Sequence, residues 1–358
     1  MSWILSVLVL GTLVLLHELG HFVVARWSGV RVVRFSIGFG PVLGRWTRGE
    51  TEYVLSLLPL GGYVKMAGEH QTEKADKPWE FLSKPAGVRA WIVFAGPLVN
   101  QLISIVALWV VLVLGYPELL PTVGRVIDDM PAKVAGLQTG DQISAVNGEQ
   151  IRTWDELTRI VHRSPEQPLQ LAVTRAGRPV TLTVTPKARE MPDPFGRMQR
   201  IGLVGVSPSG AYDTYRVGPA EAVRITATKQ IEWAGQIGLS LWSLMTGRVS
   251  MQESLTGPIG ILYMTSEAVR MGFGPVLYLV SVFSLSLAVF NLFPIPILDG
   301  GHLLFLIVEK LRGRPLSLSV QERAAQVSMA LLMVLVVVVC ANDLQRLGVF
   351  EKLRGLLD

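Results

Sequence analysis

The sequence predicts a polytopic α-helical membrane protein with about four transmembrane helices, interrupted by a segment of soluble character. Hydrophobic residues make up 50% of the 358 residues and charged residues only 17%, whereas soluble domains carry about 25% charged residues. The mean hydropathy is +0.42. The apolar residues gather in four long blocks, and an α-helix needs roughly 20 residues to cross a bilayer.

The four expected spans are Trp3–Trp27, Ala90–Gly115, Pro275–Phe293 and Val327–Ala341. The last is short, but its flanks lean towards apolar residues and can lengthen it. The first block has no basic residue before Arg26, and it lacks the A-x-A-like site at which signal peptides are cleaved. We therefore expect it to be retained as a membrane span.

Basic residues concentrate in the two short loops between spans. They are Arg26, Arg31, Arg34, Arg45, Arg48, Lys65, Lys74, Lys77, Lys84 and Arg89 in the first loop, and Lys310, Arg312, Arg314 and Arg323 in the second. Cytoplasmic loops carry such an excess, so we expect an inner-membrane protein with its N-terminus and central segment outside the cytoplasm. These loop residues, several of which lie beside apolar blocks, account for the net charge of +5, so no nucleic-acid partner is expected.

The central segment, residues 121–189, has the composition of a small α+β domain. Strands are expected at 169–173 and 180–184, joined at Gly177, and a helix at 153–162. Residues 135–143 and 146–148 resemble the PDZ family in its permuted bacterial form, which implies an inserted extracytoplasmic PDZ-like domain. The membrane core is then divided into 1–120 and 271–358.

Residues 190–270 are expected to join the PDZ-like segment to the second part of the core. The stretch 190–215 is rich in Pro and Gly and is interpreted as a linker. A helix is expected from Pro219 to Met245. Its broad apolar face fits either the membrane surface or packing against the soluble domain.

A metal-binding pattern lies at the end of the first span, where His17-Glu18-Leu19-Gly20-His21 forms HExxH. Residues four apart share one face of a helix, so both imidazoles can bind one ion, and Glu18 can act as general base. The lone cysteine, Cys340, excludes a cysteine metal site. The alternative, two histidines that only form hydrogen bonds in a helix bundle, explains neither Glu18 nor the spacing.

A third ligand is required, and Asp299 is the best candidate. The metzincin pattern is excluded because Trp27 stands where its third His would be. Asp299 is followed by Gly300 and Gly301, which allow a tight turn that aims the carboxylate inward. A plain Asp-Gly turn that caps the following helix is the alternative, and His302 and Glu309 are weaker ligand candidates.

Across nearly its whole length, the chain resembles the bacterial site-2 proteases of the RseP type. The matching motifs are His17–His21, Phe94-Ala95-Gly96-Pro97 with Asn100, Gly257-Pro258-Ile259-Gly260, and Asn291-Leu292-Phe293-Pro294 through Leu298-Asp299-Gly300-Gly301. The resemblance implies Zn²⁺ held by His17, His21 and Asp299, with Glu18 activating water. It also implies that Asn291 holds the substrate backbone or the oxyanion; a helix C-cap is the plainer interpretation of Asn291.

Residues 52–64 have strand composition and resemble the re-entrant β-element of the same family. That resemblance implies substrate binding at Gly61, Gly62 and Tyr63, because an exposed strand edge can pair with an unwound substrate. An ordinary cytoplasmic hairpin is the alternative.

The expected function is therefore zinc-dependent intramembrane endopeptidase activity in regulated intramembrane proteolysis. The resemblance implies single-pass membrane substrates already shortened by another protease, such as anti-sigma factors or remnant signal peptides. The PDZ-like segment would capture a new C-terminus or exclude bulky substrates. A membrane scaffold with a degenerate metal site and a zinc transporter are the competing functions. A transporter has no use for Glu18, and the first and fourth spans show neither the polar path nor the internal repeat that transporters have.

Overall fold

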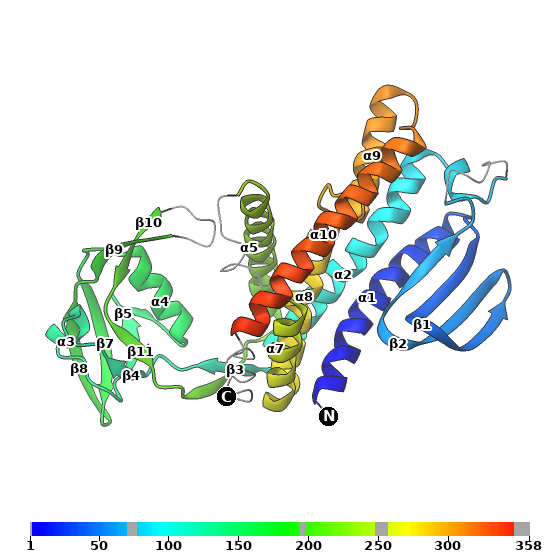
Figure 1. Cartoon of the computed structure of the whole chain (residues 1–358). Coiled ribbons are helices and arrows are strands. Elements are labelled where there is room, and N and C mark those ends of the chain that lie inside the picture. Colours follow the sequence, from blue (N-terminus) through cyan, green and yellow to red (C-terminus); the bar gives the residue numbers. More distant parts are fainter. Residues whose placement is uncertain (1, 70–76, 193–197, 248–256, 347–358) are drawn as a thin grey trace, which may run out of the picture. The chain divides into compact units, whose positions relative to one another are not determined.

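The computed structural model describes residues 2–69, 77–192, 198–247 and 257–346. The chain forms two compact units, one made of 1–110, 219–244 and 250–358, the other of 111–218 and 245–249. Figure 1 shows their elements. Each unit is described separately, and Lys74, one of the expected cytoplasmic cations, lies outside the described residues.

In its described residues, the first unit contains four helices that are long and apolar enough to cross a membrane. They are α1 (Ser2–Trp27), α2 (Ala86–Leu114), α8 (Phe273–Asn291) and α10 (Leu318–Arg346). Their most apolar windows have mean hydropathies from 2.0 to 2.5. The four expected spans are confirmed as helices, and the fourth is longer than expected because helix-forming polar residues extend it at both ends. These helices fit a polytopic membrane protein.

Among its described residues, this unit also has three shorter or less apolar helices. They are α5 (Pro219–Met245), α7 (Pro258–Met271) and α9 (Asp299–Arg312), and a single 3₁₀ turn covers Phe81–Ser83. The helix expected at 219–245 is confirmed with the same bounds. Its Gln230 bonds to Gln101 at 3.0 Å and to Ser104 at 2.8 Å, so α5 packs on α2.

The α2 and α8 helices are joined by buried hydroxyl groups. Ser104 Oγ donates to the carbonyl of Ser281 at 2.7 Å, and Ser281 Oγ donates to the carbonyl of Ser104 at 2.9 Å. One helical turn away, Ser284 Oγ donates to the carbonyl of Asn100 at 2.8 Å. Small hydroxyl residues let two apolar helices approach closely and bond across their interface.

A long irregular hairpin, β1 (Val32–Arg48) and β2 (Thr51–Met66), lies beside α1 (Figure 1). Its register shifts repeatedly: Phe35 lies opposite both Val64 and Tyr53, and Tyr53 also lies opposite Trp46. The start of β1 therefore runs between the two halves of β2. The strand expected at 52–64 is confirmed within β2.

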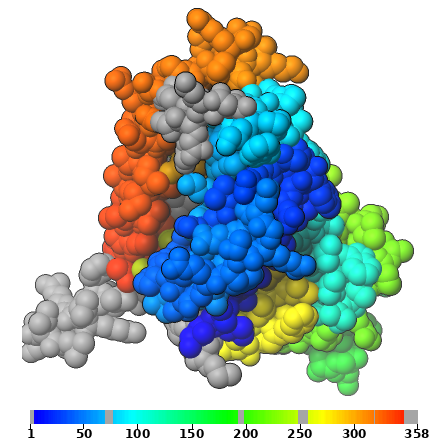
Figure 2. Space-filling view, turned by 90° about the vertical axis from the view of Figure 1, so that its right-hand side faces the viewer, coloured from blue at the N-terminus to red at the C-terminus, as the bar shows by residue number. Residues whose placement is uncertain are grey.

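The β1–β2 hairpin exposes large apolar side chains. Figure 2 views the unit from the hairpin's side, with β1 and β2 in front of the helices. The exposed side chains are Val33, Phe39, Val42, Leu43, Trp46, Leu55, Leu57, Leu58 and Leu60. An apolar surface of this kind marks contact with lipid or protein.

The described residues of the second unit form short strands and two helices. Its strands are β3 (Tyr116–Leu119), β4 (Val123–Val126), β5 (Gln142–Val146), β6 (Glu149–Gln150), β7 (Leu169–Arg175), β8 (Arg178–Val184), β9 (Lys187–Pro192), β10 (Met198–Leu203), β11 (Val206–Pro208) and β12 (Tyr212–Tyr215). The sheet order is β6-β5-β7-β8, with pairs β10-β9, β11-β4 and β12-β3. The hairpin expected around Gly177 is present.

The helices of this unit are α3 (Pro131–Val134) and α4 (Trp154–Arg163). Thr153 and Glu156 form a capping box that begins α4, one residue from the expected start. The core contains Leu157 and Val161 of α4 packed on Ile143, Leu171 and other apolar residues of the sheet. This arrangement places an amphipathic helix over one face of the sheet.

The stretch expected to be a linker, 190–215, differs from that expectation. Within the described residues it holds all of β10, β11 and β12 and the end of β9. β11 pairs with β4 and β12 with β3, strands about 80 to 100 residues earlier in the chain. Of its described Pro and Gly residues, Gly205 and Gly210 lie between strands, whereas Pro192, Gly202 and Pro208 lie within them. The richness in Pro and Gly therefore did not indicate a linker.

Candidate metal centre

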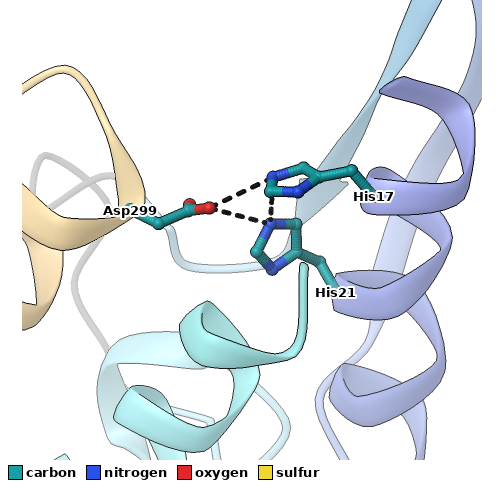
Figure 3. Close-up of side chains that lie close together, drawn as sticks. All are labelled: His17, His21 and Asp299. Carbon is teal, nitrogen blue, oxygen red and sulfur yellow. Dashed lines mark hydrogen bonds and ion pairs between the residues drawn. The ribbon is translucent and has the colours of Figure 1, made fainter. Parts of the chain in front are cut away.

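Two helices bring three ligand-type side chains together. His17 and His21 lie one turn apart on α1, and Asp299 is the first residue of α9. Figure 3 shows the Asp299 carboxylate pointing towards both imidazoles. Asp299 Oδ2 lies 3.1 Å from His17 Nε2 and 3.5 Å from His21 Nε2, and the two Nε2 atoms are 3.2 Å apart.

This donor set fits zinc. Both histidines are buried, with 7% of their surface exposed, and Asp299 is half-buried. The Oδ2 atom of Asp299 is buried and has no hydrogen-bond donor in the described part of the chain, so a cation would satisfy it. Two imidazole nitrogens and one carboxylate oxygen leave the fourth tetrahedral position open for water.

The imidazole of His21 is oriented by the backbone of α2. Its Nδ1 lies 2.9 Å from the carbonyl oxygen of Ile92. A carbonyl can only accept, so Nδ1 carries the hydrogen and Nε2 presents its lone pair. Pro97, which has no N–H, lies five residues later in the same helix.

Gly96 leaves the space that the imidazoles occupy. A Cβ atom at this position would lie 2.3 Å from His21 Nε2 and 2.7 Å from His17 Cε1. Real Cβ atoms do not approach other atoms so closely. Gly96 is therefore required for α2 to pass beside the histidines.

Gly300 and Gly301 allow the loop before α9 to pack closely against the start of that helix. Neither has a positive φ angle. Cβ atoms there would lie 2.2 Å from the carbonyl oxygen of Phe293 and 2.3 Å from that of Ile295. Glycine thus allows the preceding loop to fold against the start of α9, which differs from the expected role in a special turn conformation.

Glu18 is hydrogen-bonded to the backbone of β2. Its Oε2 accepts a hydrogen bond from the backbone N–H of Val64 at 3.2 Å. Beside it, Gly61 has φ +131, and a Cβ there would lie 2.6 Å from Val14 Cγ1 of α1. Gly62 is buried, and the half-buried Tyr63 stacks on Phe39 at 6.3 Å. These residues lie where β2 meets the turn of α1 that carries Glu18.

The remaining candidates lie outside the cluster. Asn291 is the half-buried last residue of α8. His302 is exposed, with its ring near Phe305, and Glu309 binds Arg89. Sequence reasoning gave no role to Ile92, Gly96 or Asn100, although Gly96 and Asn100 belong to a motif it singled out. All three contact the histidines across more than 70 residues of sequence.

Comparison with known proteins decides the family. The family model of Peptidase family M50 matches residues 5–335 of this chain. The chain belongs to this family, that of the site-2 proteases. It is a zinc metalloprotease of this family.

Curated relatives cover almost the entire chain. The zinc metalloprotease RasP of Geobacillus kaustophilus is 30% identical, over 96% of this chain and 98% of its own length. The regulator of sigma-W protease RasP of Bacillus subtilis is 30% identical, over 95% and 97%. A Rhizobium meliloti protein provisionally named a zinc metalloprotease is 34% identical, over 93% of each chain.

Proposed function

We propose that this M50 zinc metalloprotease cleaves single-pass transmembrane substrates within the membrane, using His17, His21 and Asp299 as zinc ligands and Glu18 as general base. The observation that carries the proposal is the convergence of the three ligand atoms, all within 4.8 Å of one another. Two of them belong to a helix that is apolar enough to span a bilayer. Ionisable groups in such helices are costly and usually functional.

The chain's own residues suit peptide hydrolysis. Zinc in this cluster supplies Lewis-acid activation of a water molecule. Glu18 is adjacent to a ligand on α1 and takes the proton from the attacking water, then delivers it to the leaving amine. Asn291 is proposed to hold the substrate backbone or the developing oxyanion; it ends α8, eight residues before Asp299.

The edge of β2 next to Glu18 is the proposed substrate-binding strand. Residues 62–66 pair with β1 on one side, and the N–H of Val64 points to Glu18 on the other. A transmembrane helix hides its carbonyls in its own hydrogen bonds, so an unwound substrate segment added to this edge would expose them beside the base. Gly61, Gly62 and Tyr63 would line its path.

The decisive experiment compares purified wild type with Glu18→Gln on a single-pass test substrate, with zinc content determined for both. We expect both proteins to contain zinc and only wild type to cut. His302→Ala is the matched control, because His302 is close in sequence to Asp299 but outside the cluster, and it should keep both zinc and activity. Equal cleavage by Glu18→Gln would refute the mechanism. Zinc retained by a wild type that cuts no substrate would favour a scaffold or transporter.

Substrates and orientation are proposed from the relatives and from charge. One relative is named as a regulator of sigma-W, so we propose anti-sigma-factor-like proteins already trimmed by another protease, or remnant signal peptides. The basic loops support an orientation with the N-terminus and the unit around β5 and β7 outside the cytoplasm of an inner membrane. Single cysteines introduced at Gly49 and Gly177, in a Cys340→Ser background, should be labelled from opposite sides.

The second unit is proposed to be the PDZ-like domain and to act by excluding bulky substrates. β10 lies directly on α4, since a Cβ at Gly202 would be 2.4 Å from the carbonyl oxygen of Val161. An added peptide strand has no room between these two elements at that point, which argues against capture of a C-terminus there.

A deletion within the second unit tests whether it excludes bulky substrates. Leu120 N donates to the carbonyl of Ala211 at 2.9 Å, so a short linker can replace residues 121–210. Exclusion predicts that the spliced protein cuts untrimmed substrate. Loss of cleavage of trimmed substrate, with zinc retained, would point to peptide capture instead.

A further inference from the structure

The two histidines of the cluster are supported in different ways. His21 Nδ1 faces a backbone carbonyl, that of Ile92. His17 Nδ1 faces a side chain, the carboxamide of Asn100, with Nδ1 and Nδ2 3.3 Å apart. Asn100 lies on α2, one turn beyond Gly96, and has 0% of its surface exposed.

The hydrogen-bonding capacity of Asn100 is incompletely used. Its Oδ1 is buried without a hydrogen-bond partner in the described part of the chain. A buried amide oxygen without a donor is destabilising, because it has lost its hydrogen bonds to water. The hydrogen-bonding neighbour of its carboxamide is a ring nitrogen of His17, and the carboxamide makes no other hydrogen bond among the described residues.

Metal binding through Nε2 determines what His17 needs at Nδ1. A neutral imidazole has one N–H and one lone pair. With the lone pair of Nε2 turned to the ion, Nδ1 carries the hydrogen and requires an acceptor. Turning the Asn100 carboxamide by 180° places Oδ1 opposite Nδ1, so the bond runs from His17 to Asn100. Nitrogen and oxygen of an amide have nearly the same shape, so the packing is unchanged.

The backbone of Asn100 is fixed by helix packing. Its carbonyl oxygen accepts the hydroxyl of Ser284 on α8 at 2.8 Å. The neighbouring turn of α2 is joined to α8 through Ser104 and Ser281. Asn100 therefore projects from a rigid pair of helices, as a residue that orients a metal ligand must.

We propose that Asn100 is a positioning residue of the metal centre: its carboxamide oxygen accepts the Nδ1–H of His17, fixing the tautomer and ring orientation that present Nε2 to zinc. The inference rests on the proposed ligand set. It assigns to the motif around Gly96 two separate tasks, because Gly96 gives the imidazoles space and Asn100 orients one of them.

Two variants of Asn100 distinguish a positioning role from a purely structural one, because the two roles predict opposite orders of zinc affinity. Asn100→Asp keeps an acceptor and gives the carboxylate–histidine–zinc arrangement common in zinc proteins. Asn100→Leu keeps a similar volume in an apolar bundle but has no acceptor. Packing alone therefore favours Leu and penalises the buried carboxylate, whereas positioning of His17 favours Asp. Ser284→Ala is the matched control, since it removes only the bond to the Asn100 carbonyl.

The test measures Zn²⁺ affinity of the full-length proteins in detergent by competition with a chelator, and the visible spectrum of their Co²⁺ forms. We expect Asn100→Leu to weaken zinc binding by about 10–100-fold and to change the Co²⁺ spectrum. Asn100→Asp should bind zinc within a few-fold of wild type or more tightly, and Ser284→Ala should match wild type.

Three results would overturn the inference. The first is wild-type affinity in Asn100→Leu. The second is a ten-fold or greater loss in Asn100→Asp, which decides the question even if the Leu protein does not fold. The third is an equal loss in Ser284→Ala. If His17→Ala itself kept wild-type zinc affinity, the proposed ligand set would fail, so the two failures can be told apart.

Discussion

The carboxylate of Glu18 accepts a hydrogen bond from the backbone N–H of Val64, with Oε2 and N 3.2 Å apart. Glu18 lies on α1 and Val64 on β2. The proposed general base is thus held by the strand whose edge is proposed to receive the substrate. The position of the base and the conformation of β2 are therefore coupled.

Removing this hydrogen bond should impair cleavage more than zinc binding. Val64→Pro deletes the N–H and disturbs the edge of β2. We expect cleavage to fall by about 10²–10⁴-fold, the usual contribution of a positioned base, with zinc content unchanged. Val64→Ala keeps the N–H and is the control, expected to remain within a few-fold of wild type. Normal activity of Val64→Pro would contradict both the role of this contact and that of the β2 edge.

Filling the space at Gly96 should damage the metal centre. The methyl group of Gly96→Ala overlaps His21 Nε2, at 2.3 Å, so an imidazole must move. We expect zinc affinity to fall by about 10–100-fold, measured by chelator competition. Gly87→Ala on the same helix meets nothing within 4 Å and should bind zinc normally. Equal affinities in the two variants would show that the histidines tolerate displacement.

A buried carboxylate joins α10 to the start of α7. Asp343 Oδ1 accepts the N–H of Gly257 at 3.0 Å, and Oδ2 accepts that of Gly260 at 2.8 Å. These are backbone donors that the first turn of a helix leaves unpaired. Asp343→Ala would bury them without partners, at about 1–3 kcal/mol each.

We therefore expect Asp343→Ala to lower the apparent Tm of the detergent-solubilised protein. Asp343→Asn keeps one acceptor and should fall between Ala and wild type. Tm values for Ala and Asn that equal that of wild type would show that this contact contributes no stability.

Acid should weaken the second unit through Asp141. The guanidinium of Arg175, with Nε and Nη2 each 2.8 Å from a carboxylate oxygen, holds the pKa of Asp141 below its usual value. Because the folded-state pKa is depressed, the ion pair stabilises above the unfolded pKa, about 3.9. That stability is lost as pH falls through the folded pKa.

The pH-dependent stabilisation by Asp141 is tested by measuring backbone amide hydrogen exchange of β5 and β7 in the full-length protein. Wild type should be better protected than Asp141→Asn at neutral pH, with the difference shrinking as pH falls below about 4. A difference that stayed constant down to low pH would mean that packing, not charge, causes it.

The sequence features that predicted most were the local ones. The spans, HExxH and the helix at 219–245 are visible within a window of 30 residues, because hydropathy and helical spacing act over that length. Asp299 required more, namely the chemical requirement for a third ligand and the two glycines that follow it.

The features that escaped prediction depend on distant partners. β1 carries Arg34, Arg45 and Arg48 among its apolar residues, so the alternation of apolar and polar side chains expected of a strand is obscured. β11 and β12 are three and four residues long and become strands only through pairing with β4 and β3. The contacts of Ile92 and Asn100 with the histidines span 71 and 83 residues, and no local pattern encodes them.

The support of His21 by the carbonyl oxygen of Ile92 has a consequence for mutagenesis. That oxygen belongs to the main chain, and every residue type at position 92 supplies it. A saturation scan of side chains would register the support of His17 at Asn100 and would be blind to the equivalent support of His21. A ranking of positions around this centre by mutational sensitivity would therefore reveal the support of one histidine and miss that of the other.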